Sequence, residues 1–406
     1  MKFGLLGRHL SHSYSPRIHA CLGDYPYSLF EVVPSQLENF LKEGSFDGIN
    51  VTIPYKKDVI PYLAALTPEA ELLGAVNTII RDGDRLIGHN TDYFGFRSML
   101  GQCDLVLSGK KVLVLGSGGA SNTVTAVLKQ LGALPIVISR RGKNHYGNLD
   151  LHADASVIVN TTPVGMYPDT LISPIDLNLF PNLDAVLDVV YNPARTKLLM
   201  DAQRRSILTK SGLWMLVAQA KESAEWFTGI KLSDVVLPKI YEKLRLEMDN
   251  IVLIGMPGCG KTTTATYLAE RLGRKMIDLD AAVIALAGCS IPEVFAQQGE
   301  EAFRKLETEV LRKYGKESGM IIATGGGSVT RPENYFHLHQ NATIFWLTRD
   351  ISKLPTEGRP LSQAGSLAHM YAARKPLYES FADHTVSNDG EIEDTVNAIL
   401  AYYNSI

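Results

Sequence analysis

The stretch NIVLIGMPGCGKTTTATYLAERLG, residues Asn250–Gly273, decides the fold of the C-terminal part of the chain. A short apolar, β-branched run leads into a turn too rich in glycine for regular structure, and apolar residues at helical spacing follow. A second stretch, KKVLVLGSGGASNTVTAVLKQLG at Lys110–Gly132, has the same organisation. A strand that feeds a helix through glycines opens a parallel α/β unit, so the sequence predicts two nucleotide-binding units.

Length and composition restrict the class of protein. A chain of 406 residues is long enough for two or three domains, and 45% hydrophobic with 20% charged residues is typical of soluble globular proteins. The net charge of -3 argues against nucleic acid or an anionic membrane as the main partner. The four cysteines form no C-x-x-C pair, which indicates reduced thiols. Apolar runs are too short to span a bilayer, so we expect a cytoplasmic protein with small-molecule partners. The sequence does not determine the oligomeric state.

The loop Gly255-Met-Pro-Gly258-Cys-Gly260-Lys261-Thr262 fits the pattern G-x-x-x-x-G-K-[ST] at every fixed position. Its glycines let backbone N–H groups surround phosphate oxygens, and the following helix presents its positive end. The lysine would reach the β- and γ-phosphates, and the threonine hydroxyl would bind Mg²⁺. A chance glycine-rich turn is the alternative, but a strand before it and a helix after it favour an ATP site.

Downstream, Asp278 and Asp280 stand two residues apart at the end of a predicted strand. One carboxylate can therefore face a metal and the other an acceptor hydroxyl, although Asp280 could instead be the N-cap of a helix that starts at Ala281. Arg304 follows in G-E-E-A-F-R, where a solvated helix charge is the alternative. The triplet Gly325–Gly327 after the strand 320–323 indicates a close approach of backbone to a ligand.

Two further motifs complete this half: Gly358-Arg359-Pro360-Leu361, in a stretch suited to a lid, and Arg374 in A-R-K-P-L-Y. Together, in order and spacing, these motifs resemble shikimate kinase from about Asn250 to the C-terminus. The resemblance implies that Asp278 and Thr262 organise Mg²⁺, that Asp280 accepts the proton of the 3-hydroxyl of shikimate, and that Arg359 meets the transferring phosphoryl group. The remaining implied residues bind substrate (Arg304, Arg374, Gly325, Gly326, Gly327) or ATP (Gly255, Gly258, Gly260, Lys261, Thr262, Thr263).

The loop Gly116-Ser-Gly118-Gly119-Ala120 follows the predicted strand 111–115 and precedes a predicted helix at about 121–131. This is a variant of the dinucleotide-binding loop, which is a weak signal without its strand and helix. The next strand, 135–138, would end in an acidic residue in an NAD-binding unit. Here it ends in Ser139-Arg140-Arg141, which favours the 2′-phosphate of NADP, with an exposed charged turn as the alternative.

Polar motifs upstream of this loop each resemble an ordinary capped turn when taken alone. Together, H-S-x-S-P, N-V-T-x-P-x-K, G-A-V-N-T and N-T-D, with later N-T-T-P-V-G-M, D-V-V-Y-N-P and G-L-W-M-L-V-A-Q-A, resemble shikimate dehydrogenase over residues 1 to about 247. The resemblance implies that Lys56 and Asp92 form the catalytic pair. It also implies a set of substrate-binding residues (Ser13, Ser15, Thr52, Asn77, Asp92, Tyr191, Gln219) and NADP-binding residues (Gly116, Gly118, Gly119, Ala120, Ser139, Arg140, Arg141).

The implied pair is chemically reasonable, because hydride transfer to a ketone creates an alkoxide that needs a proton and a nearby positive charge. An ammonium group held by a carboxylate supplies both, while the cofactor supplies the hydride. Only about twenty residues separate Arg141 from Asn160, where the family has a helix and another strand, so the NADP lobe is expected to be shortened.

The predicted architecture is therefore α/β: a dehydrogenase substrate lobe at 1–100 with returning helices at 213–247, a shortened Rossmann-like NADP lobe at 101–212, and a P-loop kinase with a central parallel sheet at 248–406. We expect NADPH-dependent reduction of 3-dehydroshikimate to shikimate, followed by ATP-dependent phosphorylation to shikimate 3-phosphate. Two alternatives stay open: a dehydrogenase for quinate or a related polyol with NAD, and a chain in which one half is an inactive ligand-binding or scaffolding module.

Overall fold

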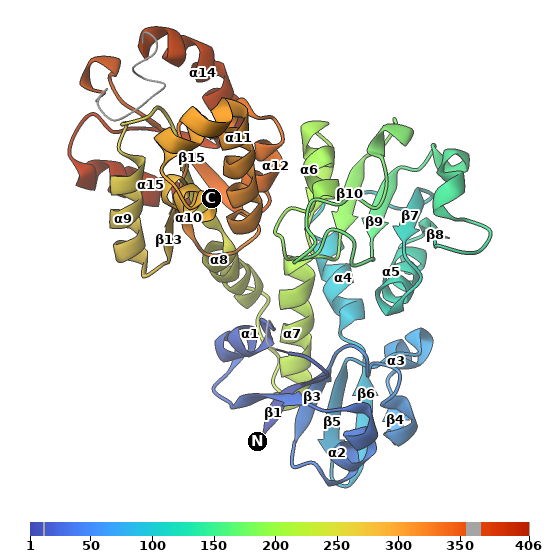
Figure 1. Cartoon of the computed structure of the whole chain (residues 1–406). Helices are drawn as coiled ribbons and strands as arrows, with labels where there is room; N and C mark the ends of the chain where they lie inside the picture. The colour runs from blue at the N-terminus through green and yellow to red at the C-terminus, as the bar shows by residue number, and fades with distance from the viewer. Residues whose placement is uncertain (11–12, 355–366, 406) are drawn as a thin grey trace. The chain divides into compact units, whose positions relative to one another are not determined.

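The computed structural model describes residues 1–10, 13–354 and 367–405 (Figure 1). The chain forms two compact units. The first contains residues 1–164, 173–191 and 201–243, and the second contains 165–172, 192–200 and 244–406. The second unit therefore includes two segments that lie far before its main part in the sequence.

The first unit begins with a mixed sheet in the order β2-β1-β3-β5-β6-β4. Strand β1 pairs in parallel with β2 and β3, and β5 pairs antiparallel with β3 and β6. Every residue of β1 and β3 is buried, because the sheet is covered on both faces. The elements of this part are β1 (Phe3–Gly7), α1 (Ser15–Leu22), β2 (Tyr27–Glu31), η1 (Pro34–Gln36), α2 (Leu37–Glu43), β3 (Gly48–Val51), η2 (Ile60–Tyr62), β4 (Ala65–Leu66), α3 (Pro68–Leu73), β5 (Thr78–Asp82) and β6 (Arg85–His89).

The second sheet of this unit is parallel, in the order β11-β10-β9-β7-β8. Its elements are β7 (Lys111–Leu115), α5 (Gly119–Gln130), β8 (Leu134–Ile138), η3 (Tyr146–His152), β9 (Val157–Asn160), η4 (Leu177–Leu179), β10 (Ala185–Asp188) and β11 (Leu208–Lys210). Helix α6 (Lys197–Arg204) begins in the second unit and ends in the first. The predicted strand–loop–helix unit is present, and its helix begins two residues earlier than expected. Between β8 and β9 the chain forms only the 3-10 helix η3, so neither the α-helix nor the further strand that the family has is present there.

Helices α4 (Asp92–Leu100) and α7 (Leu213–Thr228) lie side by side between the two sheets of the first unit (Figure 1). Gly95 makes their contact possible. A Cβ atom at this position would lie 2.8 Å from the carbonyl oxygen of Met215 and 2.9 Å from Cβ of Gln219. The two helices can therefore approach closely enough to place the beginning of α4 beside the middle of α7.

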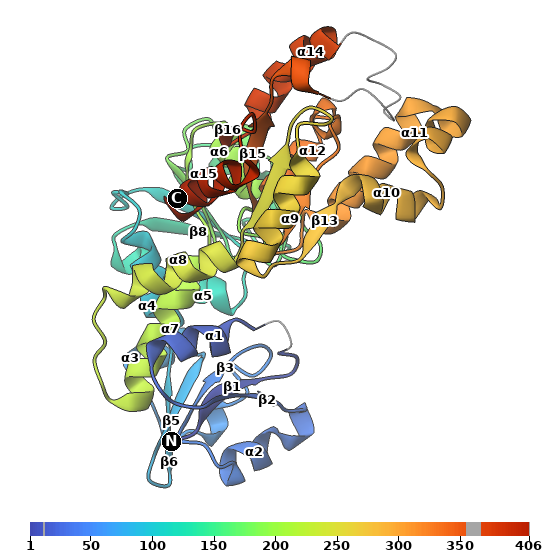
Figure 2. The ribbon, with the colours of Figure 1, turned by 90° about the vertical axis from the view of Figure 1, so that its left-hand side faces the viewer.

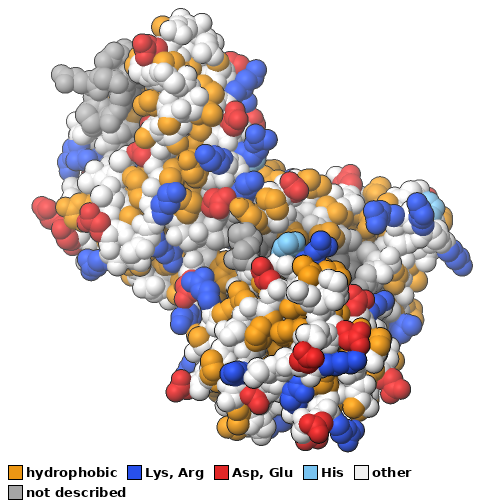
Figure 3. Space-filling view, turned by 60° about the horizontal axis from the view of Figure 1, so that its bottom comes forward, with side chains coloured by type: hydrophobic (Ala, Val, Ile, Leu, Met, Phe, Trp, Pro, Cys, Tyr) orange, Lys and Arg blue, Asp and Glu red, His pale blue; other side chains and the backbone are white. Residues whose placement is uncertain are grey.

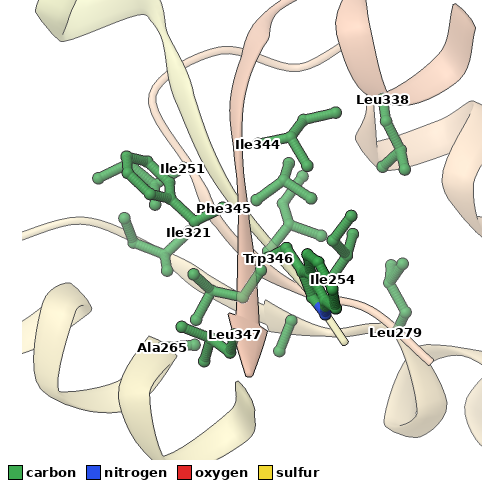
Figure 4. Close-up of a cluster of buried hydrophobic side chains, with 14 of the residues drawn as sticks. Ile251, Ile254, Ala265, Leu279, Ile321, Leu338, Ile344, Phe345, Trp346 and Leu347 are labelled. Atoms are coloured by element: carbon green, nitrogen blue, oxygen red, sulfur yellow. The ribbon is translucent and has the colours of Figure 1, made fainter. Parts of the chain in front are cut away.

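The second unit has a parallel sheet in the order β13-β14-β12-β15-β16, which confirms the central parallel sheet predicted for the P-loop half. Buried apolar side chains, including Ile251, Ile321, Ile344 and Phe345, pack around it (Figure 4). Figure 2 shows α10 and α11 extending beyond the edge of this sheet, with α9 beside the strands. The elements are α8 (Val236–Met248), which leads in from the first unit, β12 (Asn250–Ile254), α9 (Lys261–Leu272), β13 (Met276–Asp278), α10 (Leu279–Ala287), α11 (Ile291–Tyr314), β14 (Ile321–Ala323), η5 (Ser328–Thr330), α12 (Asn334–His339), β15 (Ala342–Thr348), η6 (Ile351–Lys353), α14 (Leu367–Phe381), β16 (His384–Ser387) and α15 (Ile392–Ser405).

Only one residue, Asp249, connects α8 to β12, the first strand of the sheet in the second unit. Among the helices that the structure describes, none is by itself long and apolar enough to cross a membrane. Helices α10 and α11 meet that criterion only as a pair, and an angle of 86° separates them.

Candidate active sites

The first site is organised around an ion pair between Lys56 and Asp92. Lys56 lies in the loop after β3, and Asp92 is the first residue of α4. The ammonium Nζ lies 2.5 Å from the carboxylate Oδ2, and the two side chains keep 30% and 17% of their surface exposed. The pair is partly desolvated yet open to a ligand. It can therefore hold a proton beside a bound carbonyl group.

Asn77 and Gln219 meet next to this pair through Thr91, the residue that precedes α4. The Asn77 side-chain oxygen accepts the Thr91 backbone N–H at 2.7 Å, and its amide nitrogen donates to the Thr91 hydroxyl at 3.0 Å. The same hydroxyl lies 3.4 Å from the side-chain oxygen of Gln219 on α7. The structure thus joins three predicted motifs, one from each of three separate stretches of sequence.

A buried network behind these residues was not predicted from the sequence. The Asn50 amide nitrogen donates to the hydroxyls of Ser223 at 2.8 Å and Thr78 at 3.0 Å. Its side-chain oxygen accepts the hydroxyl of Tyr27 at 2.7 Å. Asn50 belongs to the motif that contains Thr52 and Lys56, and its polarity in a buried strand was the available signal. The network holds α7 against the sheet and so positions Gln219.

The remaining predicted substrate residues of the first unit lie in loops or, for Ser15, at the first position of α1. Ser13 accepts the backbone N–H of Ser15 at 3.2 Å, and the carbonyl of Thr52 accepts the backbone N–H of Tyr55 at 2.9 Å. Tyr191 makes an edge-to-face contact with Tyr14, with 6.0 Å between ring centroids, which brings it next to the Ser13–Ser15 turn. Burial raises the pKa of the Tyr191 hydroxyl, so it stays a neutral donor.

The predicted dinucleotide loop leaves open space at the beginning of α5. Cβ atoms at Gly118 and Gly119 would meet nothing within 4 Å, whereas one at Gly116 would lie 2.9 Å from Thr162 and 3.0 Å from Thr161. Gly116 also has a φ of +105°, a backbone conformation that favours glycine. The open part of the loop lies at a helix N-terminus, which suits a pyrophosphate, and Ala120 continues the first turn of that helix.

The residues after β8 present positive charge to solvent. Arg140 and Arg141 are exposed, and the backbone N–H of Ser139 donates to the carbonyl of Asn144 at 3.2 Å. The Ser139 hydroxyl donates to the carbonyl of Arg141, which closes a tight turn. Since guanidinium groups pair well with phosphates, this turn can receive the 2′-phosphate of a dinucleotide.

The second site contains the P-loop, whose glycines have the backbone conformations that the motif requires. Gly255, Gly258 and Gly260 have φ values of +144°, +83° and +98°. The buried ammonium group of Lys261 donates to the carbonyls of Gly255 and Met256, each at 3.0 Å. These neutral carbonyl partners leave the lysine charge available for an incoming phosphate.

Thr262 and Asp278 form an oxygen pair that fits Mg²⁺. The Thr262 hydroxyl donates to Oδ2 of Asp278 at 2.6 Å. The other carboxylate oxygen, Oδ1, caps α10 by accepting the N–H groups of Asp280 at 2.9 Å and Ala281 at 3.1 Å. Magnesium commonly takes one or two protein oxygens and completes its shell with water and phosphate, so this pair is adequate. The cap also shows that the alternative role for Asp280 was wrong, because Asp278 is the N-cap and α10 begins at Leu279.

Asp280 faces the same cavity as Lys261 and Arg304. Desolvation there raises the pKa of its carboxyl group, and the negative charge of Asp278 adds to the rise. A carboxylate with a raised pKa is a better proton acceptor than an ordinary surface aspartate. This environment therefore suits a general base that acts on a hydroxyl group.

The glycine triplet packs against the charged side chains of the site. A Cβ atom at Gly327 would overlap the guanidinium group of Arg304, and one at Gly325 would lie 2.9 Å from Oδ1 of Asp280. The carbonyl of Gly326 accepts Nη1 of Arg374 at 3.0 Å and the hydroxyl of Tyr378 at 2.5 Å. The close approach predicted from the triplet is thus an approach of site side chains to backbone.

Arg304 is held by two carboxylates rather than solvated on its helix. Its Nη1 atom donates to Glu307 at 2.9 Å and its Nη2 atom to Glu300 at 3.1 Å. Glu307 is 1% exposed and also accepts the hydroxyl of Ser328 at 2.6 Å. Glu307 was not predicted as a positioning residue, although its place three residues after Arg304 on one helix was the available signal.

One cavity of about 400 Å³ brings the predicted kinase residues together. P-loop residues Gly258, Gly260, Lys261, Thr262 and Thr263 line it together with Asp280, Arg304, Gly325, Gly326, Gly327 and Arg374. Arg359, the predicted lid arginine, lies outside the described residues. A small anionic polyol and the end of a nucleotide fit the chemistry of this cavity, because it is lined by two arginines as well as by the phosphate loop.

The folds and sites define a nicotinamide-dependent oxidoreductase and a P-loop small-molecule kinase in one chain. Residues 5–79 match the family model of the shikimate dehydrogenase substrate binding domain, and residues 257–404 match that of shikimate kinase. A shikimate dehydrogenase (NADP(+)) of Clostridium perfringens is 36% identical over 266 residues, which are 60% of this chain and 98% of that protein.

Solved structures agree with this match. Shikimate dehydrogenase 1 from Peptoclostridium difficile is 38% identical with a TM-score of 0.56, and the match covers 61% of this chain and 98% of that one. A shikimate 5-dehydrogenase from Thermus thermophilus, solved with NADP(H) and shikimate, is 31% identical with a TM-score of 0.55 and covers 60% and 99%. The chain belongs to the shikimate dehydrogenase family, and it carries a shikimate kinase domain after the dehydrogenase part.

We expect Gly327→Ala to raise the KM for shikimate in the kinase reaction about tenfold or more, because the added methyl group displaces the Arg304 guanidinium from its place. Gly390→Ala is the matched control, since a Cβ atom there meets nothing closer than 3.9 Å. Steady-state kinase assays on both variants give the comparison. Equal KM values for the two variants would show that Arg304 does not bind the substrate.

Proposed function

We propose that the chain reduces 3-dehydroshikimate to shikimate with NADPH and then phosphorylates the 3-hydroxyl group of shikimate with ATP. The observation that carries the first step is the Lys56–Asp92 pair at 2.5 Å, which combines a proton donor and a positive charge in one accessible position. NADPH supplies the hydride when bound. Lys56 then protonates the oxygen of the reduced carbonyl, and Asp92 stabilises and orients the lysine.

The substrate of the dehydrogenase is proposed to lie between the turn residues and the α4–α7 contact. Thr91 holds Asn77 and Gln219 in place, and the amide nitrogen of each already donates one N–H within the chain, Asn77 to Thr91 and Gln219 to the carbonyl of Leu216. The second N–H of each amide is proposed to donate to a substrate hydroxyl. The other proposed substrate residues are Ser13, Ser15, Thr52, Asp92 and Tyr191. This assignment gives residues 1–100, with the returning helices 213–247, to substrate binding.

NADP is proposed to bind in residues 101–212. The open loop at Gly118 and Gly119 supports a pyrophosphate at the N-terminus of α5, and the exposed Arg140–Arg141 turn supports the 2′-phosphate. The absence of an acidic residue at the end of β8 counts against NAD and therefore against the quinate alternative.

The kinase reaction is proposed to take place in the cavity of the second unit, within residues 248–406. Asp280 accepts the proton of the 3-hydroxyl group, which its raised pKa favours. Arg304 and Arg374 bind the substrate carboxylate, and Lys261 contacts the nucleotide phosphates. Thr262 and Asp278 would hold Mg²⁺, which neutralises phosphate charge when bound. Arg359 is proposed to contact the phosphoryl group, as the kinase family resemblance implies.

A cytoplasmic location and small-molecule partners are part of the proposal. All four cysteines are free, which suits a reducing compartment. Basic and acidic side chains are interspersed over the face drawn in Figure 3, without a broad field of one sign. Such a surface supports neither nucleic acid nor an anionic membrane as a partner.

We expect Lys56→Ala to lower kcat of NADPH oxidation at least about a hundredfold, because the proton donor is lost. Kinase activity of the same variant stays at the wild-type level. Lys57→Ala is the matched control, since this neighbouring lysine is exposed. An unchanged rate of NADPH oxidation in Lys56→Ala would instead support the scaffold alternative for this half.

We expect Arg140→Ala to reduce the ratio of kcat/KM for NADPH to that for NADH by about tenfold or more, because one charge on the 2′-phosphate is lost. Lys143→Ala, which removes an exposed charge in the same loop, tests for a general electrostatic effect. Similar ratios in the two variants would show that Arg140 does not bind the 2′-phosphate of NADP. A wild-type preference for NADH with quinate would favour the alternative dehydrogenase.

A coupled assay tests the complete proposal. With 3-dehydroshikimate, NADPH and ATP-Mg²⁺ present, we expect shikimate 3-phosphate to form, as measured by mass spectrometry. Omission of NADPH prevents both products, whereas omission of ATP leads to accumulation of shikimate. Formation of shikimate without its phosphate in the full mixture would show that the kinase half is inactive.

A further inference from the structure

The second compact unit contains residues 165–172 and 192–200, although the shikimate kinase match begins only at residue 257. These two segments, here called the inserted segments, precede α8 in the sequence. They therefore add to the kinase unit residues that lie outside the stretch that matches shikimate kinase. Their contacts within this unit show what they contribute.

Arg195 in the second inserted segment binds the C-terminal end of α12. Its backbone N–H donates to the carbonyl of Gln340 at 2.9 Å, and its Nε atom donates to the carbonyl of His339 at 2.6 Å. Its Nη2 atom donates to the carbonyl of Ala342, where β15 begins. The last carbonyls of a helix lack partners within the helix and carry partial negative charge, so a guanidinium group is well suited to this position.

Asn341 extends this contact to the strand that carries the P-loop. Its side-chain oxygen accepts the backbone N–H of Ala194 at 2.7 Å, and its amide nitrogen donates to the carbonyl of Lys316 at 2.9 Å. The carbonyl of Asn341 accepts the backbone N–H of Asn250, the first residue of β12, at 2.7 Å. The inserted segment is thus two hydrogen bonds away from the β12 backbone.

The first inserted segment joins the same arrangement. The backbone N–H of Tyr167 donates to the carbonyl of Asn192 at 3.0 Å, which connects the two inserted segments. The Tyr167 hydroxyl donates to the Glu317 carboxylate at 3.3 Å, and the Lys316 ammonium donates to the carbonyl of Pro168 at 3.3 Å. Contacts therefore reach the loop before β14 as well as the end of α12.

These contacts are buried. Gln340, Asn341 and Ala342 are at most 1% exposed, and His339 is 7% exposed. Buried carbonyl groups need hydrogen-bond partners, and loss of a partner leaves the desolvation penalty uncompensated. Burial also raises the pKa of Asp249 to about 6, and the nearby charge of Arg195 opposes that rise. Arg195 therefore binds the carbonyl groups between α12 and β15. It also places a positive charge near the buried carboxyl group of Asp249, the residue before β12.

We infer that the inserted segments are a structural part of the kinase and that Arg195 is their anchor on the surface formed by residues 339–342. The kinase of this chain is accordingly not a free-standing domain that begins near residue 248. Its stability depends on a stretch of sequence that belongs to the dehydrogenase half.

The test uses Arg195→Met in the full chain, with hydrogen exchange of residues 334–346 and the temperature of half-inactivation of the kinase as measurements. We expect faster exchange in 334–346 and a half-inactivation temperature lower by about 5–10 °C. Before heating, kinase kcat stays near the wild-type value, because the described hydrogen bonds of Arg195 go to His339, Gln340 and Ala342, none of which lines the cavity. Arg195→Lys keeps the positive charge but cannot donate from two nitrogens to two carbonyls in the same way, so we expect an intermediate effect.

Arg205→Met is the matched control. This arginine also donates to backbone carbonyls, those of Leu177 and Phe180, but within the first unit. We expect it to leave exchange in 334–346 and the stability of the kinase unchanged. Wild-type exchange and wild-type kinase stability in both Arg195 variants, or equal effects of Arg195→Met and Arg205→Met, would overturn the inference. If Arg195→Met does not yield folded protein, Arg195→Lys is compared with Arg205→Met by the same two measurements. Faster exchange in 334–346 and lower kinase stability in Arg195→Lys alone support the inference, and equal values in the two variants overturn it.

Discussion

Both active sites depend on the same constraint: two segments of the chain must approach each other at a position where only glycine leaves room. Parallel pairing brings the ends of β12, β13 and β14 to one edge, so residues far apart in sequence meet there. The Arg304 guanidinium can occupy its position only because Gly327 has no side chain. In the first unit, Gly95 has the same effect between helices, because it lets α4 approach α7 and places Thr91 between Asn77 and Gln219.

Electrostatics complete the two sites in different ways. The chain has a net charge of -3, so anionic substrates gain little from its overall field. Each site instead holds individual cations with local acceptors: Lys56 with Asp92, Arg304 with Glu300 and Glu307, and Lys261 with P-loop carbonyls. These partners fix the positions of the cations before a ligand arrives, which reduces the reorganisation that binding requires.

Local sequence predicted the parts that have local causes. The strand–glycine–helix units at Lys111 and Asn250 follow from short motifs. The P-loop pattern predicted Thr262 and the family resemblance implied Asp278 as metal ligands, and their contact came only with the fold. The role of Asp278 as the N-cap was missed, because two neighbouring aspartates satisfy the same capping pattern. Glu307 and Asn50 were missed as positioning residues, because their function arises from contacts with partners that only the folded chain brings near.

The inserted segments also have a consequence for synthesis on the ribosome. Residues 192–200 leave the exit tunnel more than a hundred residues before α12 at Asn334–His339. At typical elongation rates of about 5–20 residues per second, that interval is about 7–27 s. During this time the nascent chain displays Arg195 without its carbonyl partners. The contacts between residues 192–200 and the kinase unit can therefore form only after α12 and the start of β15 have been synthesised.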